Sequence, residues 1–105
     1  MGYNGAEMIT DLRQAGLNSL PGADIVQEGL RDLEARQETA YALLVSIGAP
    51  RLTRAGIPVP APLSSPEDRL YWLLYRDYGD AAHSRYNALI RRLVSFERSL
   101  TSVRK

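Results

Sequence analysis

The chain has a single histidine, His83, and six residues separate it from Arg76, which Asp77 follows directly. An imidazole titrates near neutral pH, so it can take a proton from a ribose 2′-hydroxyl and return it to a leaving group. A guanidinium can neutralise the charge that builds up on the phosphate during such a reaction. Arg76 and His83 are therefore the two residues of this sequence whose chemistry fits RNA cleavage without a metal.

This spacing resembles the Arg-x4–6-His pattern, with a polar residue after the arginine, of the HEPN ribonuclease domains. Those domains are small all-helical proteins that dimerise, so that arginine and histidine from both chains meet at a cleft. The resemblance implies a metal-independent ribonuclease in which Arg76 and His83 are catalytic. It covers two or three residues, and it departs from the family's usual form because Gly79 and Asp80 place a helix boundary between the pair. The alternative interpretation, which we favour, is a partly exposed histidine in the first turn of a helix and no catalytic residue.

Other chemistries find less support in the sequence. Asp80 and His83 have the spacing of two metal ligands on a helix, but the chain has no cysteine and no second histidine to complete a site. No Gly-x-Ser-x-Gly elbow, phosphate-binding loop or Gly-x-Gly-x-x-Gly run occurs. We therefore expect no cofactor and no metal, and a protein that is not an enzyme.

Two arginine patterns suggest nucleic-acid binding. A helix-turn-helix over residues 43–56 would expose Arg51 and Arg54, but Gly56 and Pro58 end its second helix too early to fill a groove. The final predicted helix carries a second set of arginines, which could follow phosphates: Arg85, Arg91, Arg92 and Arg98. Residues 1–48 hold seven acids against three arginines, whereas residues 81–105 hold six basic residues against one acid. We therefore favour pairing of the last helix with the acidic helix that begins near Asp24, over a nucleic-acid partner.

The elements that hold these residues are predicted to be helical. Ser65, Pro66, Glu67 and Asp68 have the order of a helix start, and Gly79 marks its end. Asp80 is then expected to cap a second helix that runs to about residue 102. These two helices, residues 66–102, form a predicted αα-hairpin with a very short connection.

The residues before the hairpin are predicted to form shorter elements. Residues 1–22 are expected to be a weakly ordered arm, in which residues 8–17 fit a short amphipathic helix. A helix capped by Asp24 follows, and Thr39 is expected to cap a new helix that ends at Gly48. Pro50 then begins a brief helix, and residues 57–64 form a polyproline-like connector because proline stands at every second position.

Aromatic side chains are denser in residues 71–78 than one buried helix face requires. Tyr71, Leu74, Tyr75 and Tyr78 share a face, whereas Trp72 lies about 100° from Tyr71. Trp72 is therefore expected to point outward near Arg69 and Arg76, and aromatic residues with arginine are typical of protein interfaces. The alternative is a small bundle that buries both faces of this helix.

Taken together, the sequence predicts one all-α domain of 105 residues, a small bundle of four or five helices that ends in the hairpin. We expect the core to be Ile25, Leu30, Leu33, Leu43, Leu44, Ile47, Leu70, Leu74, Tyr78, Tyr86, Leu89, Ile90, Leu93 and Leu100. No signal-peptide pattern or membrane-spanning run occurs, so a cytoplasmic location is expected. The favoured function is a non-catalytic protein-interaction or regulatory subunit of a bacterial-type system. Its partner is expected to be a second copy of itself, as a homodimer with Trp72 near the centre, or another protein.

Overall fold

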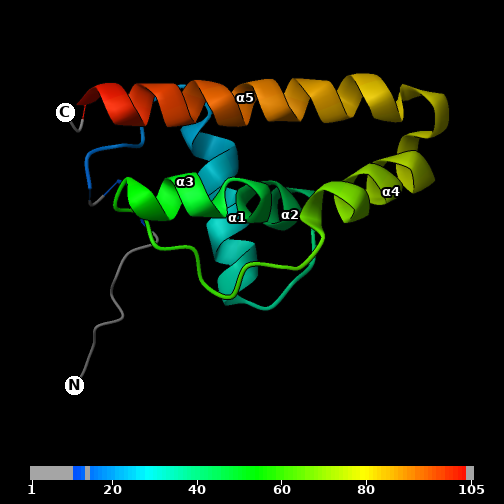
Figure 1. Ribbon diagram of the computed structural model, residues 1–105, viewed down its shortest axis with the longest axis horizontal. Helices are drawn as coiled ribbons and strands as arrows, with labels where there is room; N and C mark the ends of the chain where they lie inside the picture. Colours follow the sequence, from blue (N-terminus) through cyan, green and yellow to red (C-terminus); the bar gives the residue numbers. More distant parts are fainter. Residues whose placement is uncertain (1–10, 14, 104–105) are drawn as a thin grey trace.

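The computed structural model of the protein describes residues 11–13 and 15–103 (Figure 1). The elements are α1 (Ala23–Glu34), α2 (Ala40–Ile47), α3 (Ala49–Arg54), α4 (Pro66–Tyr78), the 3₁₀ turn η2 (Gly79–Ala81) and α5 (Ala82–Val103). None of these described residues lies in a β-strand, so the prediction of an all-α protein is confirmed. In Figure 1 the long helix α5 runs along one side of the molecule, and α2 and α3 lie beneath it.

The helix ends agree with the sequence in some places and correct it in others. Thr39 caps α2 as predicted, because its hydroxyl accepts a hydrogen bond from the backbone N–H of Ala42. Asp24 was expected to cap α1, but the helix begins after Gly22, whose φ of 80° is easy only for glycine. Ser65 precedes α4 without using its hydroxyl as a cap, and Asp80 lies inside η2 without a capping hydrogen bond.

The core forms around α2, which packs against α1, α4 and α5. Nine of the predicted core residues are buried: Ile25, Leu30, Leu33, Leu43, Leu44, Leu70, Leu74, Leu93 and Leu100. Phe96 is fully buried as well, although it was not among the predicted core residues. Phe96 lies against the Pro21-Gly22 turn. A Cβ placed on Gly22 would lie 3.2 Å from the Cβ of Phe96.

Several predicted core residues lie at the edge instead. Tyr78 is exposed, so its assignment to the core was wrong. Four others are half-buried against the core: Ile47, Tyr86, Leu89 and Ile90. For those on α4 and α5, the reason is that these two helices extend past the shorter helices, so their far ends have less of the molecule to pack against (Figure 1).

The segment before α1 is packed where it is described. Leu12 and Leu17 are buried, and the backbone N–H of Leu12 donates to the side-chain oxygen of Gln27 on α1. The predicted helix over residues 8–17 does not appear in its described part, because residues 12–13 and 15–16 form turns. Met8 and Ile9 lie outside the described residues.

The connector between α3 and α4 is neither helix nor strand, as its prolines require. It is not a continuous polyproline helix, however, because Ala61 has a φ of 44°. Both of its ends are fastened: Ile57 is buried in the core, and the backbone N–H of Leu63 donates to the hydroxyl of Ser46. The connector must bend between these two anchors.

None of the helices in the described part of the chain combines the length and apolarity that crossing a bilayer requires.

Candidate functional site

The aromatic side chains of α4 form an exposed surface on the side of this helix that faces away from α2. Trp72 is 66% exposed, and the ring of Tyr75 meets it edge to face at 5.8 Å between centroids. Tyr71 and Tyr78 are also exposed. A soluble protein rarely leaves so many large apolar side chains uncovered on one helix, so this aromatic face is the candidate functional site.

The backbone of α4 places the face outward by helical geometry. Leu70 and Leu74 are buried on the opposite side, and each lies about 160° around the helix from Trp72. The flank of α4 rests on α5, where Tyr71 packs edge to face against Tyr86 at 6.0 Å. Burial raises the pKa of the Tyr86 phenol, and the carboxylates of Glu67 and Asp68 raise it further.

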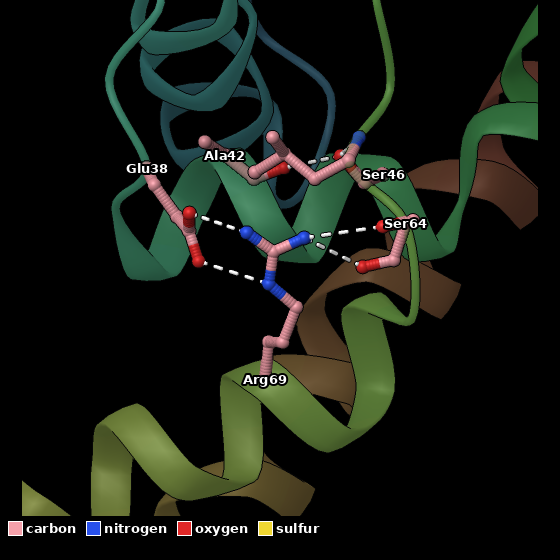
Figure 2. Close-up of polar contacts among 6 residues, drawn as sticks. Glu38, Ala42, Ser46, Ser64 and Arg69 are labelled. Carbon is pink, nitrogen blue, oxygen red and sulfur yellow. Dashed lines mark hydrogen bonds and ion pairs between the residues drawn. The ribbon is translucent and has the colours of Figure 1, made fainter.

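Arg69 holds the first turn of α4 against the rest of the molecule, as Figure 2 shows. Both carboxylate oxygens of Glu38 accept from its guanidinium, the one at Nε at 3.0 Å. The carbonyl oxygen of Ser64 accepts from its Nη1 at 2.9 Å. Arg69 was predicted to bind a partner protein, but the structure places its guanidinium in an intramolecular clamp, which fixes α4 relative to the start of α2.

Ser46 fastens the connector beside this clamp. Its buried hydroxyl donates to the carbonyl oxygen of Ala42 at 2.8 Å and accepts from the backbone N–H of Leu63 at 2.9 Å (Figure 2). Neither Ser46 nor Glu38 was predicted to be a functional or structural residue. A polar residue within the apolar run of residues 40–47 was the one available signal for Ser46, whereas the role of Glu38 depends on contacts distant in sequence.

Arg76 lies on the outer face of α4, one turn beyond Trp72. Its side chain is 73% exposed, and its Nε donates to the carboxylate of Asp77 at 3.2 Å. Asp68 lies one turn before Trp72, is exposed, and makes no ion pair with any residue that the structure describes. The aromatic face therefore has an acid at one end and a base at the other.

The two residues of the ribonuclease interpretation have separate local partners. His83 is exposed in the first turn of α5, and its Nε2 lies 3.3 Å from Nδ2 of Asn87. Arg76 pairs with Asp77 at the end of α4, and η2 separates the two helices. Within the described chain these contacts do not bring Arg76 and His83 together at a shared site.

The arginines of α5 are used in different ways. Arg92 donates to both carboxylate oxygens of Asp24, at 2.8 and 3.1 Å, and Arg85 stacks over the ring of Tyr78 at 3.8 Å. Arg91 and Arg98 are exposed without an ion pair to any described residue. The Asp24–Arg92 pair is a contact of the expected kind between the acidic and basic helices, and it lies at the first turn of α1.

A scan against protein-family models and searches of the curated proteins and of the solved structures find no match to this chain.

Proposed function

We propose that this chain is a non-catalytic protein-interaction subunit with a regulatory role, and that its helical bundle and α4–α5 hairpin serve to present the aromatic face. The observation that carries the proposal is the 66% exposure of Trp72 beside Tyr75. Tryptophan, tyrosine and arginine are the residues that most often dominate binding energy at protein interfaces.

The rigidity of α4 supports this function. The Arg69–Glu38 clamp holds its first turn, and Leu70 and Leu74 hold its inner side in the core. A face that is already ordered loses little conformational entropy when a partner binds, so more of the contact energy appears as affinity. The backbone of α4, which carries the aromatic face, is held by these contacts.

Photo-cross-linking tests the proposal directly. A benzophenone amino acid at position 75 keeps Trp72 intact and should give covalent adducts with protein in the cells that make this chain. The same amino acid at Arg54, which is exposed on α3, serves as the control and should give none. An absence of adducts at position 75 would contradict the proposed function.

The non-catalytic character is tested separately with purified protein and RNA. We expect no cleavage without metal and no change in the His83→Ala variant, because Arg76 and His83 have separate local partners. Metal-independent cleavage that disappears in His83→Ala would establish the ribonuclease instead. Retardation of RNA or DNA that weakens steeply with salt, and that Arg91→Ala and Arg98→Ala abolish, would point to nucleic-acid binding.

A further inference from the structure

On the outer face of α4, Trp72 lies midway between an acidic side chain and a basic side chain. Asp68 stands four residues before Trp72 and Arg76 four residues after it, so each lies about 6 Å along the helix and about 40° around it. All three side chains are exposed. One acid and one base thus flank a central aromatic anchor at equal distances.

This arrangement is complementary to itself under a two-fold axis. If two α4 helices pack antiparallel with their Trp72 residues at the axis, Asp68 of one lies at the level of the partner's Arg76, and the pair occurs twice. A parallel pairing would set Asp68 beside the partner's Asp68, and Arg76 beside the partner's Arg76, which repel. Closed two-fold dimers need only one such self-complementary surface.

We propose that the aromatic face binds a second copy of this chain, with the two α4 helices antiparallel, Trp72 packed against the partner's Trp72, and Asp68 paired with the partner's Arg76. This inference rests on the proposed function, because it names the partner of the same surface.

The other contacts of these residues leave the pairing open. Asp68 has no ion-pair partner among the described residues, and Arg76 uses only its Nε toward Asp77, so its terminal nitrogens remain free to donate. Arg69, the other arginine of this face, is occupied by Glu38 and Ser64 and adds no competing charge.

A charge-swap experiment tests the pairing. Analytical ultracentrifugation of the purified chain should show a monomer–dimer equilibrium with a Kd of about 10 µM, as expected for an interface one helix wide. Asp68→Arg and Arg76→Asp should each raise the Kd about tenfold, because each creates repulsion at two sites of the dimer. The double variant restores opposite charges and should return the Kd to within about threefold of the wild type.

Matched controls change the same charges elsewhere. Glu28→Arg on α1 and Arg54→Asp on α3 are exposed, and they should leave the Kd unchanged. If the double variant keeps the raised Kd of the single variants, or if the controls raise the Kd equally, the proposed pairing is wrong.

Disulfide trapping tests the antiparallel direction, and the absence of native cysteine makes it clean. Asp68→Cys and Arg76→Cys chains, mixed and oxidised, should form a mixed disulfide, because such a dimer also keeps one Asp68–Arg76 pair. Neither variant should form an efficient disulfide alone. Efficient self-linking of Asp68→Cys would instead establish the parallel arrangement.

The outcomes separate this inference from the proposed function. A chain that stays monomeric at about 0.1 mM, while the benzophenone at position 75 captures a different protein in cells, would overturn the dimer and leave the interaction function standing. Absence of both the dimer and any cross-link would overturn both.

Discussion

Gly29 sets how closely α1 and α2 approach. A Cβ at this position would lie 2.3 Å from the carbonyl oxygen of Tyr41, and backbone atoms cannot move aside as a side chain can. Alanine is the better helix former by about 1 kcal/mol, so replacing an unconstrained helical glycine stabilises a protein. Here we expect the opposite sign: Gly29→Ala should lower the free energy of unfolding by about 2 kcal/mol or more, measured by urea denaturation. An increase in stability would show that the two helices can separate freely.

The carboxyl of Asp24 makes the free energy of unfolding depend on pH in the acid range. Burial alone would raise the pKa of its carboxyl, but the hydrogen bond and charge of Arg92, together with backbone hydrogen bonds, outweigh burial and hold the pKa below the ordinary 3.8. The unfolded chain therefore binds more protons than the folded chain in this range. The stability from the pair is present above pH 3.8 and is lost as the pH falls through the folded pKa.

An NMR titration of the Asp24 carboxyl checks this expectation, with Arg92→Met as the control. The lowered pKa should return toward its ordinary value in the variant. The effect on stability should be small, because the pair is exposed to solvent. An unchanged titration in Arg92→Met would show that Arg92 is not its cause.

The connector depends on one side chain of α2. Ser46→Ala removes the acceptor of the Leu63 N–H at a half-buried site, and we expect it to cost about 1 to 2 kcal/mol of unfolding free energy. Hydrogen exchange at the Leu63 amide should accelerate more than exchange in α5. Ser84→Ala, on the exposed side of α5, should leave both measurements unchanged. Equal effects of the two substitutions would argue against a fastening role for Ser46.

The two sides of α4 should respond differently to truncation. Leu74→Ala removes a buried side chain and should cost about 2 to 5 kcal/mol of unfolding free energy. Trp72→Ala should change the stability of the dilute monomer by less than about 0.5 kcal/mol, because most of its ring is exposed. Chemical denaturation of both variants at low protein concentration gives the comparison. A large loss in Trp72→Ala would show that Trp72 belongs to the core.

At the scale of the whole molecule, association should be linked to stability. If the folded chain dimerises through α4, mass action raises its melting temperature with protein concentration. Calorimetry over a hundredfold range of concentration should show this rise for the wild type and not for Trp72→Ala. A rise that persists in Trp72→Ala would place the contact elsewhere on the molecule.

The sequence determined the helical class, most helix ends and much of the core, because these follow from local spacing. Ala40, Leu43 and Ile47 repeat at the helical period, Thr39 offers a cap, and Gly48 separates two short helices, whatever surrounds them. Tyr78 was predicted to lie in the core and is exposed, and Phe96 is buried without having been predicted there, since burial depends on where neighbouring helices end and not on the period alone.

The tertiary structure decided which partner each charged side chain has within the chain. Arg69, Arg76, Arg85 and Arg92 are equivalent charges in the sequence, but their partners are Glu38, Asp77, the Tyr78 ring and Asp24. Two of these partners lie 31 and 68 residues away along the chain, so no local pattern could identify them. The periodicity of α4 determined that Trp72 points away from Leu70 and Leu74. Only the packing of α2 and α5 against α4 decided that most of the Trp72 side chain stays exposed in the described chain.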